Sequence, residues 1–135
     1  MTIGAVEAGP QWSSTAIFVT YDDCGCFYDH VPPGYNPNGF RQGVRVPMVI
    51  ASPYAKVAYT DSHTASFASV LRFTEETFGL PALGINDLHA YDYANSFDFS
   101  QQPLLVGPRM VHSFISQAEI RRLAKLAPLH ANDPA

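Results

Sequence analysis

Two adjacent carboxylates, Asp22 and Asp23, are the residues of this sequence best suited to chemistry. They directly follow the unbroken apolar run 15–21, which is rich in β-branched and aromatic residues and predicts a buried strand. In open α/β sheets, ligands bind at the carboxyl ends of the strands. Because like charges side by side repel, the pair needs a cation or extensive hydrogen bonding. A divalent metal ion would satisfy both carboxylates, and the alternative is a pair of loop acids that cap turns and face water.

Three further residues are candidates for the same site: Asp29, His30 and His63. Asp29 and His30 lie in the loop that follows the two carboxylates, and histidine is a common metal ligand and proton carrier. The alternative for His30 is a loop histidine that is hydrogen-bonded to the backbone. His63 follows the second expected strand and precedes a helix, so we expect it to reach the same sheet edge as Asp22. Its alternative is a histidine in the first helical turn that faces water.

The other basic residues carry weaker signals. Arg41 and Arg45 bracket the beginning of the second expected strand, where they are suited either to a phosphate group or to a salt bridge with one of the loop acids. The remaining histidines have no metal-like surroundings in the sequence, and we expect all three to face solvent: His89, His112 and His130.

The elements that must position these residues follow an α/β pattern. The apolar runs 15–21 and 45–51 predict two strands, separated by a long irregular loop over 22–43. A helix is expected over about 63–78, capped by Asp61 or Ser62 and ended by Gly79 and Pro81. Its expected apolar stripe consists of Phe67, Val70, Leu71, Thr74 and Phe78. The capping-box residues Ser116 and Glu119 predict a second helix near 117–127.

Composition excludes several classes of function. The chain has 135 residues, with 8 Lys plus Arg against 12 Asp plus Glu and a formal charge of −4, which argues against a nucleic-acid partner. No apolar run approaches the ~18 residues of a transmembrane segment, and no signal peptide is visible at the N-terminus. Two cysteines are too few for a disulfide scaffold.

A family resemblance is carried by motifs that run through most of the chain. They comprise 12–23, Gly25, 27–33, 43–54, 68–73, Glu76, 78–81 and 97–99. Together they resemble the C-terminal signature of the bacterial phosphoesterase family, which holds phospholipases C and acid phosphatases. The resemblance implies the C-terminal portion of an alkaline-phosphatase-like fold, with a mostly parallel sheet flanked by helices. It also implies metal-assisted hydrolysis of a phosphoester or phospholipid, with Asp22 and Asp23 as consecutive metal ligands and His63 where a further ligand often falls.

The chain departs from the family pattern in one large respect. The family's N-terminal half carries the nucleophile, and neither Ser13 nor Ser52 has the motif expected of it, so no catalytic nucleophile is assigned. We therefore expect 1–135 to be a single partial domain, with a phosphoesterase-like core over 12–99 and a C-terminal extension over 100–135. Such a chain would be a truncated or split-gene product, or one half of a two-chain enzyme. A non-catalytic remnant is the alternative, and the localisation is left open, although family members are often exported.

The cysteines suggest a competing hypothesis, a small metal-binding module. Cys24 and Cys26 would act there with His30 and the two adjacent carboxylates. However, structural zinc sites use C-x₂₋₄-C spacing, the chain has no second cysteine pair, and a disulfide across one residue would be strained. We therefore interpret Cys24 and Cys26 as ordinary thiols. Cys26 replaces the second of two glycines that are usual in the family.

Replacing Cys24 by Ser and Cys26 by Gly should therefore leave folding intact. The physical reason is that thiols with this spacing do not complete a zinc site, and that glycine suits the tight turn expected at position 26. Thermal melts of the wild type and the double variant, each with and without zinc, measure this. A zinc-dependent stabilisation that is lost in the double variant would show that the thiols are ligands.

Overall fold

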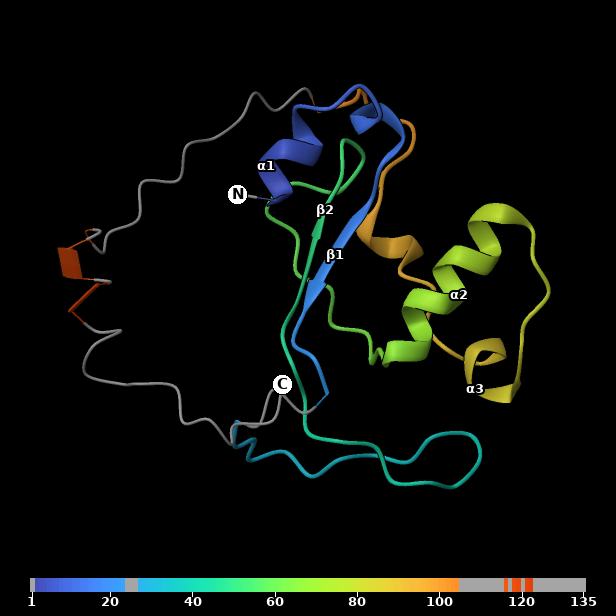
Figure 1. Cartoon of the computed structure of the whole chain (residues 1–135). Helices are drawn as coiled ribbons and strands as arrows, with labels where there is room; N and C mark the ends of the chain where they lie inside the picture. The colour runs from blue at the N-terminus through green and yellow to red at the C-terminus, as the bar shows by residue number, and fades with distance from the viewer. Residues whose placement is uncertain (1, 24–26, 105–115, 117, 120, 123–135) are drawn as a thin grey trace.

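The computed structural model describes residues 2–23, 27–104, 116, 118–119 and 121–122. The elements in chain order are α1 (Thr2–Glu7), the 3-10 helix η1 (Trp12–Ser14), β1 (Ile17–Thr20), β2 (Met48–Ala51), α2 (Phe67–Phe78), α3 (Ile85–Leu88) and the 3-10 helix η2 (Ala94–Ser96). They form a small mixed α/β structure in which α2 and α3 lie on one side of a two-stranded sheet (Figure 1). No described helix is both long and apolar enough to span a membrane.

The two strands pair in antiparallel register, with Ile17 opposite Ala51 and Thr20 opposite Met48. The prediction of a mostly parallel sheet is therefore wrong for these strands. Parallel neighbours need a crossover connection, usually a helix, that carries the chain back to the same end of the sheet. The described residues between β1 and β2 contain no helix, and the chain instead returns directly alongside β1. The larger alkaline-phosphatase-like fold stays a prediction.

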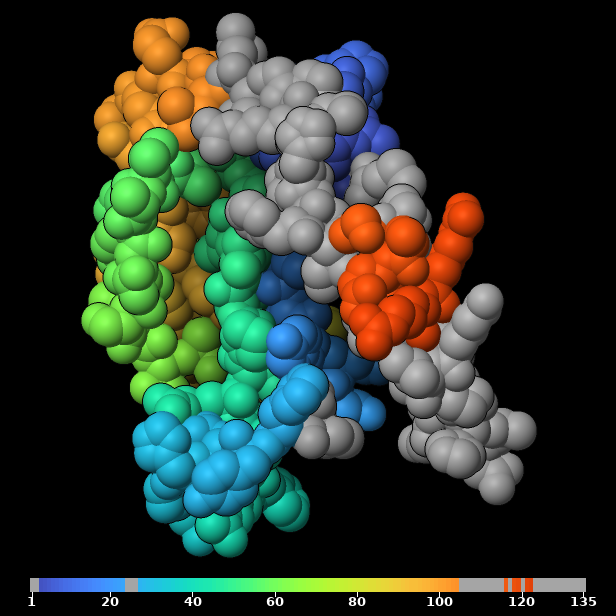
Figure 2. All heavy atoms as spheres, turned by 90° about the vertical axis from the view of Figure 1, so that its left-hand side faces the viewer, coloured from blue at the N-terminus to red at the C-terminus, as the bar shows by residue number. Residues whose placement is uncertain are grey.

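The two faces of the sheet have different surroundings. Phe18 and Ile50 are paired and share one face, where the Phe18 ring packs on Phe73 of α2 with centroids 5.1 Å apart. Val19 and Val49 share the other face and remain 39% and 60% exposed. Figure 2 looks at the molecule from that side and shows atoms of β2 at the surface. Unbroken apolar runs predicted strands covered on both faces, whereas the described residues cover only one.

An aromatic cluster holds β1, α2 and the segment after η2 together. Around Phe18 lie Phe73 at 5.1 Å, Tyr93 at 5.4 Å and Phe97 at 6.4 Å between ring centroids. Phe97 also stacks on Phe73 at 5.0 Å and on Phe99 at 5.4 Å. Aromatic pairs at these separations add to the stabilisation from buried apolar area. The cluster is therefore the main apolar contact between the sheet and the helical side of the chain.

Helix α2 begins later than predicted. It starts at Phe67 rather than near 63, and the predicted cap at Asp61 or Ser62 is wrong, because Ser66 occupies the N-cap and its N–H donates to Ser69 Oγ (3.0 Å). The predicted C-terminal stop is confirmed, since Gly79 adopts the left-handed conformation (φ 63°). The predicted apolar stripe is partly wrong: Phe67, Leu71 and Phe78 are exposed. Instead the side of the helix that carries Phe73 meets the sheet.

The long loop and the chain termini complete the structure. The described residues of the loop after β1 form no helix or regular strand, as predicted, apart from a turn closed by a bridge between Tyr35 and Arg41. Near the N-terminus, the buried Trp12 donates through Nε1 to the carbonyl oxygen of Leu104 (3.3 Å). The helix predicted near 117–127 lies largely outside the described residues, but the N–H of Glu119 does donate to Ser116 Oγ (3.2 Å).

Phe97→Ala should lower the free energy of unfolding by about 3–5 kcal/mol, because this 5% exposed ring contacts three other aromatic rings. The matched control is Phe78→Ala, where the same atoms are removed from a ring that is 71% exposed. That control should change stability by no more than about 0.5 kcal/mol. Urea unfolding of both variants checks the prediction, and equal losses would contradict the assigned core.

Candidate functional site

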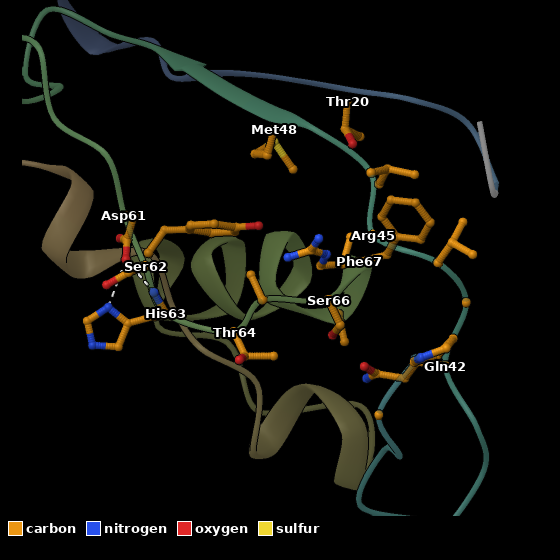
Figure 3. A pocket seen from close by; sticks show the side chains of 18 of the residues that line it. Thr20, Gln42, Arg45, Met48, Asp61, Ser62, His63, Thr64, Ser66 and Phe67 are labelled. Atoms are coloured by element: carbon orange, nitrogen blue, oxygen red, sulfur yellow. Dashed lines mark hydrogen bonds and ion pairs between the residues drawn. The ribbon is translucent and has the colours of Figure 1, made fainter. Parts of the chain in front are cut away.

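A cleft of ≈ 1220 Å³ lies between the sheet, the long loop and the segment that leads into α2 (Figure 3). Thr20 and Met48 line it from the paired strands, and 31–37 and 41–46 line it from the long loop. The opposite wall comes from 59–68, just before and within the first turn of α2. Two carboxylate residues line this cleft, Asp23 after β1 and Asp61 on the opposite wall.

The two adjacent carboxylates directly follow the strand that positions them. Asp22 and Asp23 are both exposed, two and three residues beyond the end of β1. Asp23 has a positive φ of 47°, which shows that the strand has ended and the chain turns here. Asp23 is among the residues that line the cleft, and Asp22 is not. A shared cavity for both side chains therefore stays a prediction.

Asp29 is fixed in an ion pair within the long loop. The Arg45 side chain donates to it through Nε (2.8 Å) and through a terminal nitrogen (3.0 Å), and the backbone N–H groups of Val31 and Arg45 donate at 3.1 and 3.0 Å. These donors, with Arg45 foremost, hold the pKa of Asp29 well below its usual range. Of the two alternatives for Arg45, the structure shows the salt bridge. Its effect is to tie the beginning of the loop to the residues before β2.

The other basic candidates of the loop are more exposed than Asp29. The His30 side chain is 80% exposed, and its Nδ1 lies 3.9 Å from Asp29 Oδ1. Arg41 is exposed and lines the cleft at the end of the turn that bridges Tyr35. His89 ends α3 and is exposed, as predicted, whereas His112 and His130 lie outside the described residues. Cys24 and Cys26 also lie outside them.

Asp61 is the centre of a hydrogen-bond cluster that the sequence did not reveal. Its Oδ1 accepts from the backbone N–H of His63 (3.1 Å) and lies 2.7 Å from His63 Nδ1. Its Oδ2 accepts from the hydroxyl groups of Tyr91 (2.6 Å) and Ser96 (2.7 Å). Asp61 was predicted only as a helix cap, and Tyr91 and Ser96 had no assigned role. The spacing Asp-x-His, typical of a local turn, was the one available signal.

Electrostatics at Asp61 follow from these contacts. Burial tends to raise the pKa of Asp61, but the donors from Tyr91, His63 and Ser96 outweigh it and hold the pKa well below the usual value. Burial and the bond to Asp61 raise the pKa of Tyr91 to about 12, so its hydroxyl remains a proton donor at neutral pH. Asp61 is therefore a fixed carboxylate, and its hydrogen bonds secure the segment 61–63 to Tyr91 and to Ser96 of η2.

His63 lies at the Asp61 end of the cleft, stacked on the Tyr91 ring with centroids 4.6 Å apart. Figure 3 shows its ring turned toward Asp61 and well separated from Thr20, the last residue of β1. His63 would reach the sheet edge of Asp22 if the two strands were parallel. Because β2 instead ends opposite Ile17, the chain leaves the sheet there at the far end from Asp22. Metal ligation by His63 stays a prediction, and the strand geometry does not support it.

The carboxylates of Asp22 and Asp23 have the donor chemistry of a divalent metal site, because hard cations bind carboxylate oxygens. They amount to part of such a site: in the described portion of the chain, no three His, Cys, Asp or Glu residues are grouped so as to hold a metal ion. Of the two serines considered as nucleophiles, Ser13 is exposed, and Ser52 is buried with its Oγ accepting from the N–H of Tyr54 (3.3 Å).

Comparisons with known proteins identify relatives of one kind. The family model described as "Phosphoesterase family" matches residues 1–81. "Non-hemolytic phospholipase C" of Burkholderia pseudomallei is 32% identical over 100 residues, which cover 55% of this chain and 14% of that protein. "Phospholipase C A" of Mycobacterium tuberculosis is 27% identical over 130 residues, covering 77% and 25%. "Non-specific phospholipase C6" of Arabidopsis thaliana is 40% identical over 65 residues, covering 37% and 12%. The chain thus spans a quarter or less of these relatives' length.

Asp61→Asn should lower the free energy of unfolding by about 2–3 kcal/mol at pH 7, because it removes a charged acceptor from a part-buried cluster. Tyr91→Phe and Ser96→Ala, which each remove one donor, should cost less. Since the pKa of Asp61 is lowered on folding, its contribution is present at neutral pH and is lost as the pH falls below about 4. Urea unfolding against pH measures this, and an unchanged acid slope in Asp61→Asn would contradict it.

Proposed function

This chain belongs to the phosphoesterase family, and from that premise we propose that it is part of a metal-assisted phosphoester hydrolase of the phospholipase C or acid phosphatase type. The family match and the relatives named phospholipase C support a phosphoester hydrolase family. Phospholipase C is the type named in those relatives, and a phospholipid or another phosphoester is accordingly the proposed substrate class.

The observation that carries the proposal is the place of Asp22 and Asp23. They lie two and three residues beyond the end of β1, within the part of the chain that the family model matches, and Asp23 lines the cleft. We propose that both carboxylates hold a divalent metal ion, whose identity stays open. When bound, that ion would supply Lewis-acid stabilisation of charge on the phosphoryl oxygens. Asp22 and Asp23 would contribute the negative charge that binds the metal ion, and the turn at Asp23 would place that charge at the cleft.

Other residues of the chain would support this site without reacting. The ion pair between Asp29 and Arg45 fixes the loop that begins just beyond the carboxylates. The Asp61 cluster fixes the opposite wall of the cleft. Both arrangements hold loop segments in place before substrate binds, which reduces the ordering needed when a ligand enters the cleft. Neither the Asp29–Arg45 ion pair nor the Asp61 cluster is proposed to transfer a proton to the substrate.

We propose that the nucleophile and the remaining metal ligands come from a phosphoesterase segment that is not among these 135 residues. The chain covers only 14% of the Burkholderia relative and 25% of the mycobacterial one, and neither Ser13 nor Ser52 is placed as a nucleophile. That segment could be joined to this chain or be a separate N-terminal half. The exposed valines on the open sheet face, Val19 and Val49, are consistent with such a partner.

The purified 135-residue chain alone should show no turnover of a chromogenic phosphomonoester or of phosphorylcholine esters, because it has only part of the catalytic set. Activity that copurifies with the chain through several chromatographic steps would contradict this expectation. A second arm restores the context: residues 12–99 replace the corresponding segment of the mycobacterial relative, whose match covers 77% of this chain, and the chimera is assayed with the same substrates.

In an active chimera, Asp22→Asn should lower kcat/KM and metal content by at least about 10–100-fold, the loss typical of even indirect support to a metal ligand. The matched control is Asp92→Asn, which keeps an oxygen to accept from the N–H of Ala94 and does not line the cleft. An Asp22→Asn chimera with unaltered rate and metal content would overturn the assignment of the metal site.

A further inference from the structure

Two carboxyl groups that the proposed function does not use meet between α2 and α3. Glu75 of α2 is 2% exposed and Asp87 of α3 is 5% exposed. A single backbone N–H, that of Leu83, is directed at both: it lies 2.6 Å from Asp87 Oδ2 and 3.3 Å from Glu75 Oε1. Two buried carboxylates this close cannot both be ionised without strong repulsion. One of them must therefore retain a proton or gain a cation.

The donors around the pair are distributed unequally. Asp87 Oδ2 accepts from the N–H of Leu83 and also from the N–H of Gly84 (3.0 Å), so Asp87 has more hydrogen-bond donors than Glu75. Glu75 shares one of these donors, and its buried Oε2 has no donor directed at it from any described residue. An ionised Glu75 would leave that oxygen uncompensated, whereas a protonated Glu75 can donate from it.

The charged groups nearby agree with this division. Burial, followed by the bond to Asp87, raises the pKa of Glu75. Burial would raise the pKa of Asp87 as well, but the N–H groups of Gly84 and Leu83 outweigh it and lower that pKa. On α2, Arg72 attracts Glu75 but is itself paired with the exposed Glu76. In the segment 79–89, Asp87 and His89 are the only titratable residues, and His89 is exposed at the end of α3.

We propose that Glu75 and Asp87 share one proton, and that this acid–carboxylate clasp fastens the segment 83–88 to α2 at low pH and loosens as the pH rises. Next to Asp87 on α3, Asn86 lines the cleft. Its Oδ1 accepts a hydrogen bond from Asn38 Nδ2 of the long loop (3.3 Å). Loss of the proton would therefore loosen a wall of the cleft as well. The proposal concerns this chain alone and does not depend on the proposed hydrolase activity.

The direction of the pH effect follows from proton linkage. A group that binds its proton more tightly in the folded state stabilises that state at low pH, and the contribution is lost as the pH rises through the folded-state pKa. Glu75 is such a group. Asp87 behaves in the opposite way, so its contribution is lost only in strong acid. The clasp should thus be firmest in mild acid and weaken toward alkaline pH.

Hydrogen exchange of the Leu83 and Gly84 amides tests the proposal in the full 135-residue chain, because these N–H groups donate to the pair. Their protection factors, corrected for the intrinsic pH dependence of exchange, should be highest in mild acid. They should fall by at most about tenfold per pH unit, the slope for the loss of one proton, between the ordinary pKa of a glutamate and the raised pKa of Glu75, and they should level off above it. The midpoint of this fall is the quantity that the variants shift. Protection that stays constant from pH 5 to pH 9 would overturn the proposal.

Variants separate the shared proton from other causes. Glu75→Gln presents an N–H in place of the acid proton, so protection of Leu83 and Gly84 should become independent of pH. The matched control, Glu76→Gln, makes the same change on the exposed side of α2 and should keep the wild-type slope.

Asp87→Asn provides an independent arm if Glu75→Gln does not fold. It keeps an oxygen that can accept from Leu83 and Gly84 but removes the carboxylate that retains the proton of Glu75. The midpoint should therefore move to lower pH. A wild-type slope in Glu75→Gln, or an unmoved midpoint in Asp87→Asn, would show that the pH dependence arises elsewhere.

Discussion

The packing of aromatic rings around Phe18 is the contact on which the rest of this structure depends. One strand residue brings together Phe73 of α2 and both Tyr93 and Phe97 from the region of η2. A two-stranded sheet is at best marginally stable without such support. The cluster therefore fixes β1 relative to α2, and both elements carry residues of the cleft.

In the irregular segments, hydrogen-bonded carboxylates hold the chain in place. Asp29 joins the two ends of the long loop through Arg45, and Asp61 joins the segment before α2 to Tyr91 and Ser96. Each accepts several donors, which compensates the cost of partial burial. Asp22 and Asp23 differ from them because they are exposed at a turn. Asp29 and Asp61 therefore hold loop segments in place, whereas the side chains of Asp22 and Asp23 are exposed to solvent.

The match to the phosphoesterase family covers most of these features. The matched region, residues 1–81, includes the strand that presents Asp22 and Asp23, the long loop and α2. The aromatic cluster extends beyond it to Phe97 and Phe99, so the physical core of the chain is larger than the family match. The match covers 14% of the Burkholderia relative and 25% of the mycobacterial one. The sheet face that carries the exposed Val19 and Val49 lies opposite α2.

The sequence by itself determined the family, the two strands, the long loop and the glycine that ends α2, because motif order, apolar runs and backbone preference are local properties. It did not determine the antiparallel pairing, which depends on the path of the loop, or the side of α2 that meets the sheet. It also could not join Asp61 to Ser96, 35 residues away, or Glu75 to Asp87. Those contacts were decided by the tertiary structure, since a buried carboxylate takes whichever donors the packed chain places beside it.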